Sequence, residues 1–176
     1  MTPPPWCSPS TILASAGQDG TVRLWDTWAY TQIRSFNAHG GGVLFHEGKY
    51  YWFGEHKIAS EAGNRAWEGV HCYSSSDLYN WHDEGIVLSV IKTDSTHDIT
   101  AGCVLERPKV IYNGSSGKFV MWFHLELKGM GYKAARSGVA VADRVTGPYT
   151  FVRSFRPNAG FWPQNVPEAE RQINPI

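Results

Sequence analysis

The sequence predicts an all-β, propeller-type fold, and three observations support this. The chain of 176 residues contains 18 glycines, 10 prolines and 14% aromatic residues, a composition typical of many strands and turns. Short apolar runs alternate with Gly-containing turns. A pattern of two strands at residues 43–45 and 50–53 also recurs at 110–112 and 119–123, with an offset of 67 residues for the first strand. Such an internal repeat is typical of propellers.

The first segments do not belong to this repeat. Residues 1–10 are rich in Pro and Ser and are expected to be a disordered lead. Residues 11–27, TILASAGQDGTVRLWDT, predict a hairpin, because Asp19 and Gly20 form a tight-turn dipeptide and apolar residues alternate after it. With a strand expected at 32–36, residues 11–36 resemble a single WD repeat. A non-catalytic WD-like module that binds protein through its rim is therefore the alternative function.

Each repeat unit is expected to form one four-stranded propeller blade. The third strands, 69–76 and 138–143, recur 69 residues apart, and a polar turn leads from each into a fourth strand. The expected strands are 43–45, 50–53, 69–76 and 85–90 in the first unit, and 110–112, 119–123, 138–143 and 150–155 in the second. The resulting blades span residues 37–92 and 103–158, with a tail at 159–176.

Polar side chains gather at the ends of the first hairpin. His39 is expected to precede its first strand, after which Gly40 to Gly42 allow a sharp turn, while Glu55 and His56 are expected to follow its second strand. The ends of an antiparallel pair meet at one rim, so these side chains should lie together. His39 is interpreted either as a sugar ligand or as a tie to a neighbouring blade, and Glu55 either as a pocket residue or as a solvated strand end.

Several motifs resemble glycoside hydrolase family 43, in its exo-β-1,3-galactanase-like branch. They are NAHGGG at 37–42, YWFGE at 51–55, LERPKVIYN at 105–113, GVAVAD at 138–143 and TGPY at 146–149. The resemblance implies a partial five-bladed β-propeller with its site on the central axis. It also implies hydrolysis, with inversion, of a terminal β-1,3-linked galactose from galactan or arabinogalactan. The general acid would lie in a later blade, so this chain is expected to be a truncated relative that is weakly active or inactive alone.

The resemblance also implies which residues meet the sugar. Glu106 matches a sugar-contacting carboxylate rather than the general acid, and an Arg-paired or solvated loop carboxylate is the alternative interpretation. The substrate-binding residues expected beside it are His39, Gly40, Glu55, Arg107, His124, Glu126 and Tyr132. Of these, His124, Glu126 and Tyr132 are expected to follow the second strand of the second unit, where the insertion at 127–136 would shape substrate entry or be a plain surface loop.

Composition also excludes several kinds of partner. Sixteen basic and sixteen acidic residues leave no net field to attract nucleic acid or an anionic membrane, although uncovered blade faces leave room for a protein partner. The pairs His71–Cys72 and His97–Asp98 lack metal-site spacing, so no metal or cofactor is expected; an axial calcium in the complete family fold stays open. The three cysteines are expected to be free thiols. With no signal peptide visible, a cytoplasmic location is expected as written, whereas complete relatives would be secreted.

Overall fold

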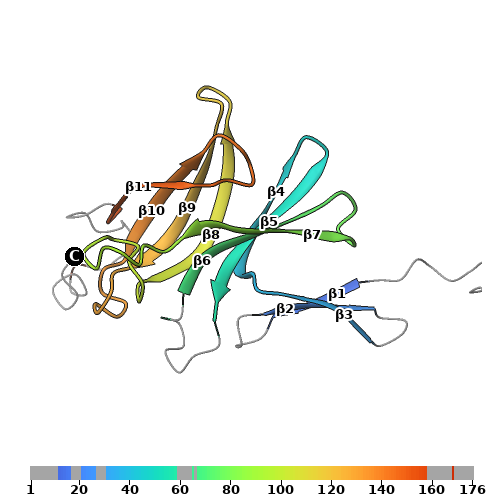
Figure 1. Cartoon of the computed structure of the whole chain (residues 1–176), viewed down its shortest axis with the longest axis horizontal. Helices are drawn as coiled ribbons and strands as arrows, with labels where there is room; N and C mark the ends of the chain where they lie inside the picture. Colours follow the sequence, from blue (N-terminus) through green and yellow to red (C-terminus); the bar gives the residue numbers. More distant parts are fainter. Residues whose placement is uncertain are drawn as a thin grey trace, which may run out of the picture.

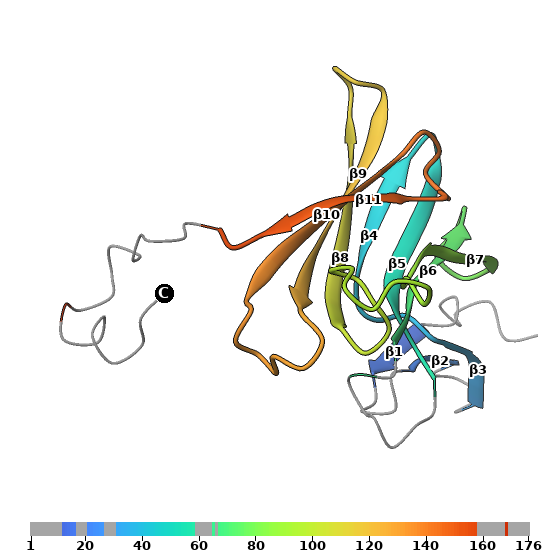
Figure 2. The same ribbon diagram turned by 60° about the vertical axis from the view of Figure 1, so that its left-hand side comes forward.

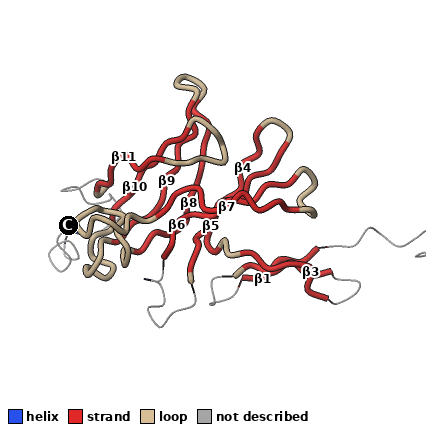
Figure 3. Tube along the Cα trace, in the orientation of Figure 1, coloured by secondary structure: helices blue, strands red, loops and turns tan. Residues whose placement is uncertain are grey.

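The computed structural model describes residues 12–16, 21–26, 31–58, 65, 67–157 and 168. These residues form three antiparallel sheets joined by loops (Figures 1 and 3). The N-terminal sheet contains β1 (Ile12–Ala16), β2 (Val22–Asp26) and β3 (Thr31–Phe36). Sheet one contains β4 (His39–His46), β5 (Lys49–Lys57), β6 (Trp67–Ser75) and β7 (Trp81–Ser89). Sheet two contains β8 (Val104–Asn113), β9 (Lys118–Glu126), β10 (Arg136–Ala142) and β11 (Thr150–Phe155).

Sheets one and two are both four-stranded meanders in chain order, the arrangement of a propeller blade. The all-β prediction is confirmed, and each of the eight strands expected in the two repeat units overlaps an observed strand. At the N-terminus, β1 and β2 pair as a hairpin from Ile12 opposite Asp26 to Ala16 opposite Val22. The turn expected at Asp19 and Gly20 lies outside the described residues, so the WD-repeat assignment stays a prediction.

The strands extend farther than their apolar runs. His39 begins β4, and Glu55 and His56 lie within β5, so the expectation that these residues flank the strands is wrong. Glycine explains the extension, because a Cβ at Gly54 would lie 2.3 Å from the backbone of Ala38 and only glycine lets β4 and β5 continue this close. His124 and Glu126 likewise belong to the end of β9 instead of following it.

The main core lies where the two sheets face each other. Inner strands β4 and β8 lie side by side, as the views in Figures 1 and 2 agree. In β9 the alternate residues Phe119, Met121, Phe123 and Leu125 are buried, the pattern of a strand with one covered face. Phe53 of β5 is fully buried in the same cluster. Burial of these side chains holds the two sheets together and positions their shared rim.

The N-terminal sheet packs on the other face of sheet one, through Phe36. The Phe36 ring lies 5.3 Å from Trp52, 4.9 Å from Tyr73 and 6.2 Å from Trp81, measured between ring centroids. The next residue, Asn37, donates through its amide nitrogen to the carbonyl oxygen of Lys57 (2.6 Å) and accepts from the backbone N–H of Lys57 (3.0 Å). Aromatic packing and a two-way hydrogen bond therefore fix the start of β4 against the end of β5.

The thiols are part of this packing. Cys72 and Cys103 are free and buried, as expected, while Cys7 lies outside the described residues. Burial raises the pKa of Cys103 to about 12 and raises the pKa of Cys72 further, so both remain protonated and unreactive. No helix within the described part of the chain is long and apolar enough to span a membrane.

Replacing Phe36 with Ala is expected to reduce the free energy of unfolding by about 3–4 kcal/mol, because it removes a 3%-exposed ring that contacts three others. Urea unfolding followed by tryptophan fluorescence measures the loss. Leu13→Ala in the same sheet is the control, since Leu13 is 58% exposed and its truncation should cost less than about 0.5 kcal/mol. Equal losses in the two variants would show that the N-terminal sheet does not pack on sheet one.

Candidate functional site

Both inner strands bulge at the same end. In β4, Gly40 and Gly41 together lie opposite the single residue Gly54, between the pairs His39–Glu55 and Gly42–Phe53, so β4 has one extra residue. In β8, residues 107 and 108 likewise lie opposite one residue of β9, Phe123, between the pairs Glu106–His124 and Lys109–Trp122. Bulges end the regular pairing and redirect side chains, so each strand turns polar groups toward the common rim of the two sheets.

The carboxylate of Glu55 joins the two sheets. Glu55 is 2% exposed, and its Oε1 accepts the backbone N–H of Arg107 from β8 at 2.9 Å. Its Oε2 lies 3.2 Å from Nζ of Lys57 and 3.3 Å from Nδ1 of His39. A buried carboxylate is stable only when such partners replace water. The arrangement thus fixes Arg107, whose φ is 54°, in the left-handed conformation required by the bulge.

Gly40 makes room for this carboxylate. Its φ is 61°, and a Cβ built on it would lie 2.4 Å from Oε1 of Glu55. A side chain at this position would therefore displace the oxygen that accepts the Arg107 N–H, in addition to being strained. Gly40 is therefore required by the position of Glu55, and its contact with a sugar stays a prediction.

A second group of polar residues surrounds Glu106. The hydroxyl of Tyr132 donates to Oε1 of Glu106 at 2.8 Å, and the Tyr132 ring stacks on His124 with a 10° interplanar angle. Nε2 of His124 lies 2.9 Å from Oε1 of Glu126. Glu126 is 1% exposed and accepts the backbone N–H groups of residues 134 and 135 at 2.8–3.1 Å. Glu126 thereby holds the loop that places Tyr132 over Glu106.

The structure brings all the predicted site residues to one rim, in two adjoining groups. The first contains His39, Gly40, Glu55 and Arg107, and the second contains Glu106, His124, Glu126 and Tyr132. The peptide bond between Glu106 and Arg107 joins the groups. Glu55 and Glu126 are buried and engaged by protein donors, whereas Glu106 and Tyr132 are accessible to solvent. Whether each residue contacts a ligand stays a prediction.

Lys57 is a rim residue that sequence reasoning missed. Its ammonium pairs with Glu55 and lies 4.9 Å from the centroid of the Trp67 ring. The available signal was its spacing, because Lys57 follows Glu55 by two residues in a strand and so shares its face. Beside the rim, a cavity of about 340 Å³ lies between Val104, Leu127 and Tyr132. The rim therefore offers an aromatic ring, an accessible carboxylate and several donors next to open volume, which suits a ligand rich in hydroxyl groups.

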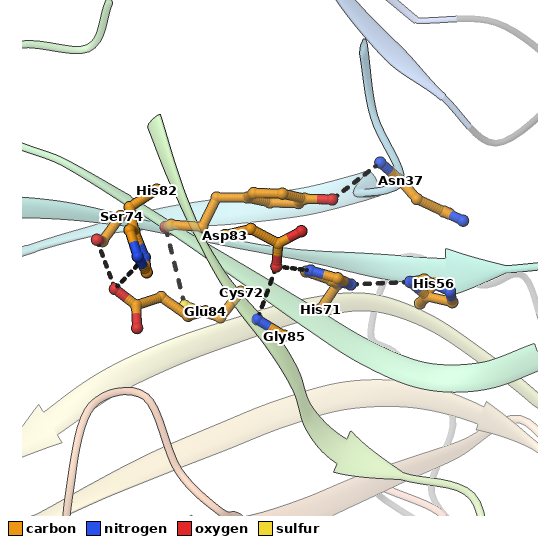
Figure 4. Close-up of polar contacts among 10 residues, drawn as sticks. Asn37, His56, His71, Cys72, Ser74, His82, Asp83, Glu84 and Gly85 are labelled. Atoms are coloured by element: carbon orange, nitrogen blue, oxygen red, sulfur yellow. Dashed lines mark hydrogen bonds and ion pairs between the residues drawn. The ribbon is translucent and has the colours of Figure 1, made fainter. Parts of the chain in front are cut away.

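A separate polar chain runs across the other face of sheet one (Figure 4). Nδ1 of His56 lies 2.8 Å from Nδ1 of His71, and Nε2 of His71 lies 2.5 Å from Oδ1 of Asp83, which also accepts the N–H of Gly85. Burial, followed by the nearby His71, lowers the pKa of His56. No group of three or more His, Cys, Asp or Glu side chains among the described residues could hold a metal ion. The hydrogen bonds among His56, His71 and Asp83 instead cross-link β5, β6 and β7.

Solved structures similar to this chain come from one enzyme family. A GH43 β-1,3-galactosidase with galactodeoxynojirimycin is 58% identical, with a TM-score of 0.67 over 79% of this chain and 39% of that protein. An exo-β-1,3-galactanase from Phanerochaete chrysosporium with β-1,3-galactotriose is 40% identical, with a TM-score of 0.60 over 76% of this chain and 28% of that one. An exo-β-1,3-galactanase from Clostridium thermocellum is 40% identical, with a TM-score of 0.59 over 77% of this chain and 27% of that protein.

These relatives are longer than the chain, which spans well under half of each. No protein-family model matches the sequence, and no curated protein matches it. The match to the solved structures confirms the family resemblance over most of this chain and a part of those proteins.

Replacing Gly40 with Ala is expected to lower the free energy of unfolding by about 2–4 kcal/mol, because the new Cβ collides with the buried Glu55 carboxylate at a left-handed position. Gly48→Ala is the matched control: its φ is 79° and no atom lies within 4 Å of its Cβ position, so it should show only the backbone cost of about 1 kcal/mol. Thermal unfolding measures both, and losses of the same size would contradict the close approach of Glu55.

The lowered pKa of His56 predicts a pH dependence of stability. The folded protein binds a proton at His56 less readily than the unfolded chain, in which histidine has a pKa of about 6.5. The free energy of unfolding is therefore highest above that pH and falls as the pH decreases through it. His56→Gln should flatten the fall between pH 7 and 5. The slope of unfolding free energy against pH should change by only a fraction of the one-proton limit, which is about 1.4 kcal/mol per pH unit, because His56 is only half-buried.

Urea unfolding at several pH values tests this dependence. His82→Gln is the control, because the His82 side chain is 76% exposed and lies on the same sheet. If the two variants keep the same slope of unfolding free energy against pH, His56 is not the group responsible.

Proposed function

We propose that the rim of this chain binds a terminal β-linked galactose of a galactan or arabinogalactan. The proposal follows from the relation of the chain to the glycoside hydrolase family 43 exo-β-1,3-galactanases over part of their fold. The observation that carries the proposal is the Glu106–Tyr132 pair, which is accessible to solvent at the junction of two sheets that Glu55 joins. Two of the similar structures are complexes, one with galactodeoxynojirimycin and one with β-1,3-galactotriose, which supports the sugar class.

The geometry suggests a role for each rim residue. Oε1 of Glu106 accepts from Tyr132, which leaves Oε2 to accept from sugar hydroxyls, and Tyr132 offers its ring to the C–H face of the sugar. His39, with its side chain 38% exposed, and Arg107 can donate from the neighbouring group. Glu55 and Glu126 act through others, since Glu55 positions the Arg107 backbone and Glu126 the loop that bears Tyr132.

Binding does not by itself supply hydrolysis. Inversion requires a general acid and a general base about 6.5–9.5 Å apart, with a water between the base and the sugar. Among the described rim residues, Glu55 and Glu126 are buried and bonded to protein donors, which leaves Glu106 as the accessible carboxylate. We therefore propose a galactoside-binding protein that hydrolyses galactan weakly or not at all without further acidic groups.

For the N-terminal sheet we propose a covering role rather than the rim of a WD-like interaction module. Its Leu24 and Phe36 are buried against Tyr73 and Trp81 of sheet one. An interaction module would instead need its apolar residues free for a partner. Among the side chains of this sheet that the structure describes, Leu13 is the one exposed large apolar residue, and one residue does not make such a patch.

Glu106→Gln is expected to weaken binding of β-1,3-galactobiose by about tenfold or more, because a hydrogen bond to a charged group contributes about 1.5–3 kcal/mol. Tyr132→Phe removes the hydroxyl that orients Glu106 and should weaken binding by about fivefold. Isothermal titration calorimetry measures the affinities. Glu68→Gln is the control, since Glu68 pairs with Lys92 outside the rim.

A parallel assay with β-1,3-galactan measures released galactose, which is expected to stay at or near background. Unchanged galactobiose affinity in both Glu106→Gln and Tyr132→Phe would refute the rim as the sugar site. Rapid galactose release by the wild-type chain would instead show that its own carboxylates complete the reaction.

A further inference from the structure

We infer that the opposite rim of the two sheets carries a second carbohydrate site, a cavity of about 340 Å³ that takes one neutral sugar ring. The site does not rest on the proposed galactose site, because the strands separate the two. His39 and Glu106 lie near the starts of β4 and β8, whereas the cavity is bounded by the turns at the far ends of the same strands. These turns stand apart from the N-terminal sheet in Figure 1.

The cavity is built from both sheets. His46 ends β4, Glu47 lies in the β4–β5 turn, and Tyr112 and Phe119 flank the β8–β9 turn. The His46 ring lies 5.0 Å from Tyr112 and 4.9 Å from Phe119, and it is perpendicular to Phe119. The aromatic residues therefore hold one another across the junction, so that wall exists before any ligand binds.

A strap from sheet two closes the third side. Residues 143–145 line the cavity, and the strap continues to Tyr149, whose backbone N–H donates to the carbonyl oxygen of Val87 in sheet one at 2.7 Å. The Tyr149 ring is 6% exposed, and its hydroxyl donates to the carbonyl oxygen of Val145 at 3.0 Å. The strap is thus anchored to both sheets, which gives the cavity a fixed shape and limits the ordering cost of binding.

The polar groups of the walls combine acceptors with donors. The side chains of Glu47 and Asp143 are 85% and 82% exposed, and both carboxylates can accept hydrogen bonds, Asp143 through Oδ2 because Lys118 donates to its Oδ1. Arg144 uses its Nε to hold the carbonyl oxygen of Gly147 at 3.2 Å, and no further partner of its guanidinium occurs among the described residues. Tyr51 also lines the cavity, and its hydroxyl has no hydrogen bond within the described part of the chain.

A neutral sugar suits this set better than other ligand classes. Sugar hydroxyls donate to carboxylates and accept from guanidinium and phenol groups at the same time, while the C–H face of the ring packs on an aromatic side chain such as Tyr112, which is 46% exposed. The carboxylates of Glu47 and Asp143 are balanced by Arg144 and by Lys118, which pairs with Asp143, so the charges around the cavity cancel and do not favour a phosphate or another anion over a neutral ligand. The charged walls disfavour a purely apolar ligand, which would leave them desolvated without partners.

Nuclear magnetic resonance tests the second site with galactose as the probe. Gly117 and Val145 line the cavity, so the chemical shifts of their backbone amides should change as galactose is added and reach a plateau at high galactose concentration. The same shifts should persist in Glu106→Gln, in which the first site is impaired. Tyr112→Ala and Glu47→Gln should each raise the dissociation constant at the cavity by about fivefold or more. Tyr79→Ala is the aromatic control, since Tyr79 is exposed outside the cavity and should leave the constant unchanged.

The outcomes separate the two sites. Loss of the Gly117 and Val145 shifts in Tyr112→Ala, with the shifts retained in Glu106→Gln, supports a second sugar site even if the first site fails. If Tyr112→Ala does not fold, Glu47→Gln decides, because Glu47 is a surface residue. No saturable shift with galactose, shifts that vanish in Glu106→Gln, or shifts produced equally by inorganic phosphate would each overturn the inference.

Discussion

The buried carboxylate of Glu55 is the contact on which the rest of the rim depends. A charge that is 2% exposed must find its partners within the protein, and here they come from three strands: His39 of β4, Lys57 of β5 and the backbone N–H of Arg107 in β8. The last of these crosses from sheet one to sheet two. Apolar burial brings the sheets together without fixing their register, whereas a directional hydrogen bond to one backbone N–H does fix it.

The hydrogen bond from the Arg107 N–H to Glu55 also positions Glu106, which one peptide bond joins to Arg107. Because the Arg107 N–H must point at Glu55, the chain bulges at this residue, and Glu106 before it stays outside the inter-sheet core. The same strand places Glu106 opposite His124, just as β4 places His39 opposite Glu55. The two sheets therefore carry the same cross-strand pair of histidine and glutamate with the positions exchanged. The exchange decides which carboxylate is buried at the junction and which meets solvent.

Sequence alone predicted the strand order and the repeat, because both depend on local signals. Alternating apolar residues and Gly-containing turns specify where strands run, and the 67-residue offset that joins Val43 to Val110 also joins His39 to Glu106. Sequence did not predict how far the strands continue or that Glu126 holds the 127–135 loop. Those features depend on bulges and on contacts between distant residues, such as the bond from Arg107 to Glu55 across 52 positions. The glycines at 40 and 54 hinted at the close approach, but not at its partner.

The outer faces of the two paired sheets differ in how far they are covered. One face of sheet one is covered by the N-terminal sheet through Phe36, so the Glu55 side of the rim is complete and rigid. On sheet two, Trp122 remains 40% exposed and Ile111 54% exposed, and Arg153 shields part of the neighbouring Phe155 ring at 5.1 Å. His124, which corresponds to Glu55, is accordingly 30% exposed where Glu55 is buried. The Glu55 side of the rim is thus covered by neighbouring strands, while the equivalent side of sheet two is more open to solvent.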